Sequence, residues 1–174
     1  LFSPAAGLAL ALALEQEFNL KPVIKWPNDV LLNGAKVCGI LAEAHWPAAR
    51  APYAVLGVGV NIGVRSIPPE PRFPATALEL SVGKPVDRWQ VLAAWLTAFT
   101  ELRSWIGQKR FLDAWRSRLA YLGEAVRLET PTGVINGKLI GISPQGDLQL
   151  ELSQGQQAQF TAGDLSLRPA QIPQ

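Results

Sequence analysis

The dipeptide Asn33-Gly34, placed between two short apolar runs, constrains the fold of this chain more than any other sequence feature. Asn and Gly both tolerate the left-handed backbone of a tight turn, so this pair is the strongest short signal for a β-hairpin. Strand-like runs surround it at residues 22–26, 30–32, 36–43 and 53–60. We therefore expect an antiparallel meander of strands joined by short connections.

The segment before the meander is expected to be a buried helix. Leu and Ala alternate within residues 4–18. A period of two ordinarily indicates a strand, but the segment is too long for a typical strand and both residue types are strong helix formers. Ser3 followed by Pro4 is typical of a helix start, because Ser can cap free amides and Pro fits the first turn.

Three more helices are predicted after the meander, the first a short one over residues 75–80. Residues 66–74 contain four prolines and are expected to form a surface loop. Apolar residues then recur with helical spacing over residues 89–106 and 109–120, and we expect their aromatic side chains to pack in the core. Asp87 and Gln90 have the spacing of a capping box at the start of the helix over residues 89–106.

From Gly123 onward the pattern changes to short β-like runs separated by Gly- and Pro-containing turns, which is typical of a small barrel. The whole chain is therefore expected to be α+β. We place a domain boundary near residues 120–123, giving one domain of residues 1–120 and a second of residues 121–174.

Composition excludes several classes of protein. Hydrophobic residues make up 48% of the 174 residues and charged residues 17%, which is typical of a globular chain. The net charge of +2 is small and no basic run predicts a nucleic-acid surface. No apolar run approaches the length of a membrane span, and a cytoplasmic location is the default expectation. The single cysteine, Cys38, excludes an intramolecular disulfide, and its spacing from His45 does not predict a zinc site.

The turn Trp26-Pro27-Asn28-Asp29 is the first candidate site. Pro27 restricts its own backbone and that of Trp26, so the next two residues lie on a rigid corner at a strand end. The amide of Asn28 matches the donor and acceptor pattern of adenine. Asp29 can accept from a ribose hydroxyl or a structural amide, or bind magnesium. The motif alone is more typical of an ordinary Asx turn than of a ligand site.

A second candidate is Lys36, which begins an apolar run that holds no other charge before Glu43. Its ammonium group can neutralise a carboxylate and the charge that develops at an attacked phosphate. The alternative is a lysine that merely extends to solvent from a strand end. Gly39, three residues later, allows close approach of a ligand to the backbone.

The run Gly57-Val58-Gly59-Val60-Asn61 contains two glycines, but it does not fit a dinucleotide-binding loop. Gly63 comes one position too late for that pattern, and a proline-rich loop follows where a helix should begin. The chain also contains no phosphate-binding loop of the Walker type. We instead expect these glycines to let a flat ligand or another strand come close.

Taken together, these motifs resemble the central motifs of biotin protein ligases. The resemblance rests on Lys25-Trp26-Pro27-Asn28-Asp29, Lys36-Val37-Cys38-Gly39-Ile40-Leu41 and Gly57-Val58-Gly59-Val60-Asn61, with Gly123-Glu124-Ala125-Val126 and Gly163-Asp164-Leu165-Ser166-Leu167-Arg168 in the C-terminal part. It implies a catalytic domain like that of class II aminoacyl-tRNA synthetases, with a mainly antiparallel sheet and helices, followed by a small SH3-like β-barrel.

The resemblance also implies an activity. Biotin and ATP would react, with Mg²⁺, to biotinyl-5'-adenylate, and the biotinyl group would pass to a lysine of a biotin carboxyl carrier protein. The implied roles are Lys36 as the catalytic residue and carboxylate ligand; Gly39, Ile40 and Gly57 in the biotin pocket; Asn28 and Asn61 at the adenine; and Lys25 and Asp29 at the phosphates, with Asp29 a weak candidate for magnesium. No membrane or nucleic-acid partner is expected from this chain, and a homodimer is left open.

One feature of the family has no counterpart here. Its Gly-Arg-Gly-Arg-type loop, which closes over the adenylate, is absent from these residues, as are its upstream Ser/Thr and Gln contacts to biotin. We therefore expect weak or no ligase activity from the chain alone. The alternatives are a catalytically impaired fragment that binds biotin or biotinyl-adenylate, and part of a biotin-responsive transcription repressor. Lipoate-attaching ligases are not expected to carry the turn of residues 25–29 together with Lys36.

Overall fold

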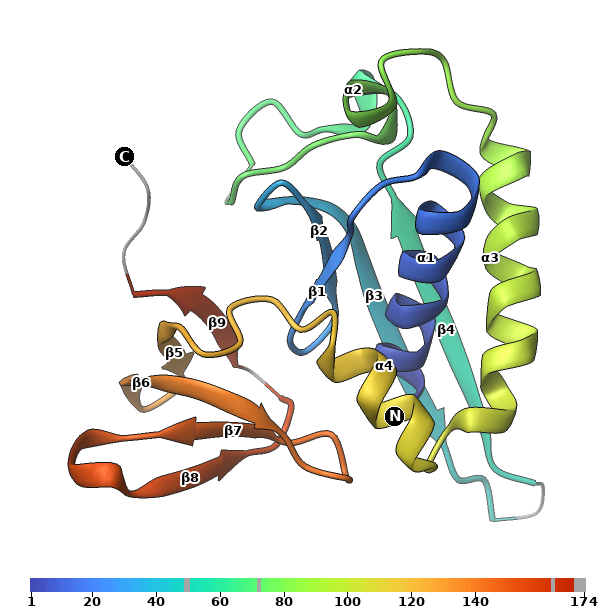
Figure 1. The fold of residues 1–174 in the computed structure, drawn as a ribbon. Helices are drawn as coiled ribbons and strands as arrows, with labels where there is room; N and C mark the ends of the chain where they lie inside the picture. The colour runs from blue at the N-terminus through green and yellow to red at the C-terminus, as the bar shows by residue number, and fades with distance from the viewer. Residues whose placement is uncertain (49–50, 72, 164, 171–174) are drawn as a thin grey trace.

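The structure is a computed structural model that describes residues 1–48, 51–71, 73–163 and 165–170. Three predicted features therefore lie partly outside the described residues: Asp164 of the closing motif, Arg72 of the proline-rich loop and residues 171–174 of the C-terminal domain. Within the described residues, the chain forms two antiparallel sheets with helices packed on the first one (Figure 1).

The first sheet confirms the predicted meander. Its strands are β1 (Val23–Lys25), β2 (Asp29–Leu32), β3 (Ala35–His45) and β4 (Tyr53–Val60), and they pair antiparallel in chain order. Asn33 and Gly34 have φ values of 50° and 78° and join β2 to β3, as the hairpin signal predicts. The pairing of β2 with β3 shifts at Val30/Leu31, where an irregularity changes the register.

The helical elements are α1 (Phe2–Phe18), α2 (Leu78–Val82), α3 (Arg88–Leu102) and α4 (Lys109–Arg116), with short 3-10 turns η1 (Val64–Ser66), η2 (Arg103–Trp105) and η3 (Ser153–Gly155). Helix α1 packs against one face of the first sheet, and α3 packs against α1 (Figure 1). The opposite face of that sheet is not covered by these helices. Among the described helices, none is long and apolar enough to cross a membrane.

Helix α1 explains the alternating Leu and Ala pattern. It lies between the sheet and α3, and Leu8, Leu10 and Leu14 are all fully buried although they point in different directions around the helix. A helix that is buried on nearly every side needs no polar face, so its sequence loses the helical period. The prediction of a Ser3 cap was wrong: the helix begins at Phe2, and the buried Oγ of Ser3 has no hydrogen-bond partner within the described residues.

Helix α3 departs from its prediction in two ways. Asp87 caps the helix by accepting from the backbone N–H of Trp89 at 2.9 Å, but Gln90 donates to Glu17 of α1 at 3.0 Å and does not complete a capping box. Trp89 is also 63% exposed, so its predicted place in the core was wrong. Helix α3 packs through Val91 and the residues that follow on the same side, because α1 lies there.

The second sheet contains the four predicted C-terminal strands and a fifth. Its members are β5 (Ala125–Thr130), β6 (Gly133–Ile142), β7 (Leu148–Glu151), β8 (Gln157–Phe160) and β9 (Ser166–Pro169), in the order β8-β7-β6-β5-β9. The fifth, β9, comes from the closing motif and pairs antiparallel with β5. All neighbouring pairs are antiparallel, as expected for a small all-β unit.

One of the two buried hydrophobic clusters in the described residues joins the first sheet to the second. Ile24 of β1 and Trp26, which follows β1, belong to the same buried cluster as Trp115 of α4 and Val126 and Leu148 of the second sheet. The other cluster lies between α1 and strands β2 and β3. The division of the chain near residues 120–123 therefore stays a prediction, since packing is continuous across it.

Candidate functional site

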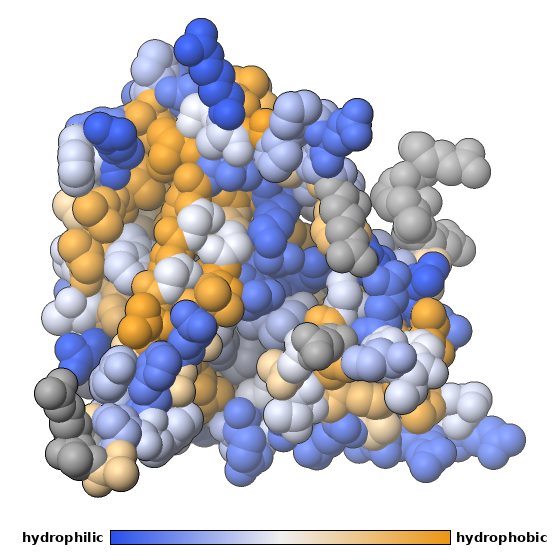
Figure 2. All heavy atoms as spheres, turned by 180° about the vertical axis from the view of Figure 1, so that it is seen from behind, coloured by the Kyte–Doolittle hydropathy of each residue, from blue (hydrophilic) through white to orange (hydrophobic). Residues whose placement is uncertain are grey.

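Three of the predicted site residues, Lys25, Asp29 and Gly39, lie in one lateral row across the first sheet. The strand register pairs Lys25 with Asp29, Asp29 with Gly39, and Gly39 with Gly59, so the row crosses all four strands. Register partners share a face of the sheet, and this row lies on the face opposite to α1 and α3. Figure 2, seen from behind, shows hydrophobic side chains next to a hollowed hydrophilic region.

Asp29 is the electrostatic centre of this row. Its carboxylate is 7% exposed, and it is shared by two lysines. The ammonium of Lys25 lies 2.8 Å from Oδ2 and that of Lys36 lies 2.5 Å from Oδ1. Two positive charges on one negative charge leave a surplus positive charge at the site, which favours an anionic ligand. Because Lys36 is the more exposed of the two lysines, its ammonium is the one that a ligand can reach.

Gly39 makes room for Lys36. A Cβ at Gly39 would lie 2.9 Å from Nζ and 3.0 Å from Cε of Lys36, which is closer than side-chain carbons approach other atoms. The missing side chain therefore lets Lys36 lie flat over β3 and reach Asp29. This is a packing reason for the glycine that sequence analysis did not foresee, and the predicted contact of Gly39 with a ligand stays a prediction.

A shallow depression on this face collects most of the predicted biotin residues. It is lined by Asn28, Lys36, Gly39, Ile40, Leu41, Gly57, Val58 and Gly59. A Cβ at Gly57 or Gly59 would make only ordinary contacts, at 3.8 Å and 3.7 Å from the nearest backbone oxygens. The packing of the protein would accept a side chain at either position, so the two glycines leave the bottom of the depression open to a ligand.

Leu41, Val58 and Gly59 were missed as lining residues. The alternation of β4 was a usable signal for Gly59, because residues two apart on a strand share a face and Gly57 was already a candidate. Leu41 follows from its pairing with Gly57, which becomes known only when the register is known.

The two asparagines are partly engaged by the protein backbone. Asn28 donates from its side-chain Nδ2 to the backbone carbonyl of Ile40 at 2.8 Å. The backbone carbonyl of Asn28 accepts from the Ile40 N–H at 2.9 Å. Asn61 donates from Nδ2 to the carbonyl of Thr76 at 3.0 Å and lies outside the depression. Each amide therefore has one donor committed to holding a neighbouring segment, and the predicted adenine contacts stay predictions.

Asp29 does not fit a direct magnesium ligand in this arrangement. Each of its oxygens contacts a lysine ammonium, and a bound cation would have to displace at least one of them. Within the described ranges, no group of three or more His, Cys, Asp or Glu side chains is placed to hold a metal ion. We derive no chemical step through a protein-bound metal.

Cys38 is close to the site residues in the sequence, but its side chain lies in the hydrophobic core and not in the site. It is 1% exposed and packs in the core between the sheet and the helices. Burial, opposed by the charge of Lys36 and assisted by that of Asp29, raises the pKa of its thiol to about 12. The thiol is therefore protonated at neutral pH and is not available as a nucleophile.

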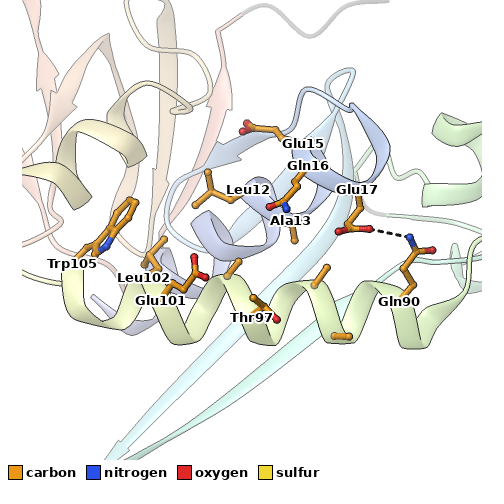
Figure 3. Close-up of a pocket in the computed structure, with 13 residues that line it drawn as sticks. Leu12, Ala13, Glu15, Gln16, Glu17, Gln90, Thr97, Glu101, Leu102 and Trp105 are labelled. Carbon is orange, nitrogen blue, oxygen red and sulfur yellow. Dashed lines mark hydrogen bonds between the residues drawn. The ribbon is translucent and has the colours of Figure 1, made fainter.

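A separate groove of about 760 Å³ runs between α1 and α3 (Figure 3). Its walls carry Glu15, Glu17 and Glu101, and Glu17 accepts from Gln90 across it. Glu15 is paired with Arg118 at 2.7 Å. None of the predicted site residues lines this groove.

The fold and the site define a class of protein ligase. Residues 2–61 match the family described as "Biotin/lipoate A/B protein ligase family", and residues 121–168 match "Biotin protein ligase C terminal domain". The first match spans β1 to β4 with the charged row, and the second spans the second sheet.

Comparisons with individual relatives specify the family further. The chain is 32% identical to the "Biotin--[acetyl-CoA-carboxylase] ligase" of Paracoccus denitrificans, with 90% of this chain and 68% of the relative covered. It is 31% identical to the "Bifunctional ligase/repressor BirA" of Bacillus subtilis, with 86% of this chain covered but only 48% of the relative. The chain belongs to the biotin protein ligase family. It spans about half the length of that Bacillus relative.

Solved structures confirm the fold class. The biotin protein ligase from Aquifex aeolicus in complex with biotin and ATP superposes with a TM-score of 0.82 at 33% identity, covering 97% of this chain and 71% of that one. The expected α+β fold of a biotin ligase catalytic domain, with a C-terminal β-sheet unit, is therefore confirmed.

Proposed function

We propose that this chain carries the part of a biotin protein ligase in which biotin and ATP react to form biotinyl-5'-adenylate. The proposal rests on the position of Lys36: its ammonium is paired with Asp29, and its side chain lines the depression that also contains Gly39, Gly57 and Gly59. This reaction joins a carboxylate to a phosphate, and both are anions that repel each other. A lysine between them lowers that repulsion and stabilises the charge that develops at phosphorus.

The depression accounts for the biotin side of the reaction. Gly57 and Gly59 leave a flat floor, and the exposed side chain of Leu41 supplies apolar contacts for a ring and an alkyl chain. The side chain of Ile40 is buried against α1, so the predicted contribution of Ile40 to the pocket is limited to its backbone. A carboxylate at the end of that alkyl chain would meet the ammonium of Lys36. The known complex of the Aquifex ligase with biotin and ATP supports this choice of ligands.

The corner at Asn28 accounts for the nucleotide side. Asn28 borders the depression next to the charged row, where the surplus positive charge favours the phosphates of ATP. Lys25 is nearly buried, so it balances Asp29 and supports the corner while Lys36 faces the ligand. Magnesium would then arrive with ATP and be held by its phosphates.

The second half of the reaction is transfer of the biotinyl group to a lysine of a biotin carboxyl carrier protein. The names of relatives as acetyl-CoA-carboxylase ligases support a carrier of this kind. The cytoplasm is the corresponding location. Sedimentation measurements distinguish a monomer from the homodimer that the resemblance leaves open.

Biotin-dependent exchange of pyrophosphate into ATP tests the first half of the reaction in the intact gene product. Lys36→Ala should reduce exchange by a factor of about 100 or more, as expected for loss of one positioned charge at the reacting groups. Lys84→Ala removes an exposed lysine in a turn away from the site and serves as the control. Exchange that survives Lys36→Ala unchanged would refute the role of Lys36. Tight binding of biotinyl-adenylate without exchange would favour a binding fragment instead.

A further inference from the structure

A buried indole ties the corner of the site to the second sheet. Trp26 directly follows β1 and precedes Pro27 and Asn28, and it is 1% exposed. Its indole N–H donates to the carbonyl of Gly146, 3.0 Å away, in the turn between β6 and β7. A buried donor or acceptor that loses its partner costs about 1–3 kcal/mol, so this bond fixes the orientation of the ring.

The acceptor lies in a turn that is itself well anchored. Ser143 is 2% exposed, and its Oγ accepts from the backbone N–H groups of Gln145 and Asp147 at 3.2 Å and 3.1 Å. The N–H of Gly146 donates back to the Ser143 carbonyl at 2.9 Å. Gly146 has a φ of 91°, a conformation that favours glycine. The carbonyl that receives the indole is therefore held in one position.

Strand β1, which leads into the corner, is hydrogen-bonded to the segment that precedes the second sheet. The N–H of Ile24 donates to the Arg118 carbonyl at 2.7 Å, and the N–H of Ala120 donates to the Ile24 carbonyl at 2.9 Å. Residues 118–120 lead directly into β5. Lys25, next along β1, has its ammonium 5.5 Å from the ring centre of Phe73, and that ring lies 3.7 Å from the guanidinium of Arg168 in β9.

We infer that Trp26 is a positioning residue: through its bond to Gly146, the second sheet sets the place of the corner that carries Asn28 and Asp29. Trp26 is covalently linked to Pro27, the first residue of the corner, whereas Lys36 contacts the corner through its ion pair with Asp29. A corner released from Gly146 would let Asn28 and the Asp29 carboxylate move, and the nearly buried ammonium of Lys25 would follow, whereas the more exposed Lys36 stays on β3. This inference rests on the proposed function, because it assigns Trp26 to the nucleotide side of the same site.

The test compares two tryptophans that make the same kind of bond. Trp26→Phe removes the indole N–H at the corner, and Trp95→Phe removes an indole N–H that donates to the Ala6 carbonyl at 3.0 Å between α3 and α1. Both variants should remain folded by circular dichroism with similar decreases in melting temperature. Only Trp26→Phe should weaken ATP binding in calorimetry and lower the turnover number of pyrophosphate exchange, each about tenfold, as expected for a small displacement of reacting groups.

Biotin affinity provides the contrast within the same variant. The floor at Gly57 and Gly59 belongs to β4, two strands away from β2, so biotin binding by Trp26→Phe should stay within about twofold of wild type. Equal ATP affinity and turnover in the two tryptophan variants would overturn the inference. A wild-type protein that binds neither biotin nor ATP would instead refute the proposed function.

A second variant covers the case in which Trp26→Phe does not fold. Ser143→Ala leaves the indole in place but removes the two bonds that its Oγ accepts within the acceptor turn. It should show the same selective loss of ATP affinity with biotin affinity retained. Unchanged ATP affinity in a folded Ser143→Ala protein would count against the second sheet as the element that places the corner.

Discussion

Gly39→Ala separates the position of Lys36 from the stability of the fold. The new Cβ would lie 2.9 Å from Nζ of Lys36, against 3.4 Å for ordinary contact, so the ammonium must move by at least 3.4 − 2.9 = 0.5 Å. The neighbour is the far end of a flexible side chain, and Gly39 does not have a positive φ, so the backbone can accept alanine. Lys36 is 39% exposed, and its ion pair with Asp29 contributes less than about 1 kcal/mol after solvent screening. The free energy of unfolding should therefore change by no more than about 1 kcal/mol.

Activity should respond far more strongly than stability. A displacement of this size at a reacting group lowers a rate by a factor of about 10 to 100. Pyrophosphate exchange measures the rate, and urea unfolding measures the stability. Gly163→Ala is the matched control, because a Cβ there has no atom within 4 Å. Full exchange activity in Gly39→Ala would refute the placement of Lys36, and a loss of several kcal/mol would show that the backbone moves instead of the lysine.

Two further predictions concern the buried groups of the first sheet. Asp29→Asn leaves the nearly buried ammonium of Lys25 without its counter-charge, so we expect a loss of about 2–3 kcal/mol in urea unfolding, and Asp113→Asn, at an exposed lysine pair, should cost less than about 1 kcal/mol. For Cys38, the pKa of about 12 in the folded protein lies above the ordinary thiol pKa of 9.0, so the contribution of the buried thiol to stability is complete below pH 9 and is lost as pH rises towards 12. Wild type should therefore lose about 1 kcal/mol more than Cys38→Val between pH 7 and pH 10, and an equal loss in both proteins would contradict the burial effect.

Local chemistry made the first sheet predictable. The Asn33-Gly34 turn needs positive φ at both positions, and few residue types provide it, so the hairpin could be read directly. The corner at residues 26–29 was equally predictable, because Pro27 restricts its own backbone and that of Trp26. Lys36 stood out because a charge in an apolar run needs a partner, and the partner proved to be Asp29.

Contacts between distant segments were not predictable in the same way. The bond from Trp26 to Gly146 joins residues 120 positions apart, and nothing in either local sequence points to the other. The exposed Trp89 shows a related limit: helical spacing identifies an apolar face but does not say which face a neighbouring helix covers. The row from Lys25 to Gly59 depends on strand register, which the irregularity at Val30/Leu31 shifts by one residue.

The core that both sheets share has a consequence for how the protein can be divided. Trp26, Phe111 and Trp115 are buried against side chains of the second sheet. Removal of residues beyond 123 would leave these three large rings facing water, and the isolated C-terminal strands would lose the surface that covers their own apolar side chains. We therefore expect that the boundary predicted near residues 120–123 is not a place where the chain can be cut, and that grafting the second sheet onto another member of the family would require grafting α4 and the segment around Trp26 with it.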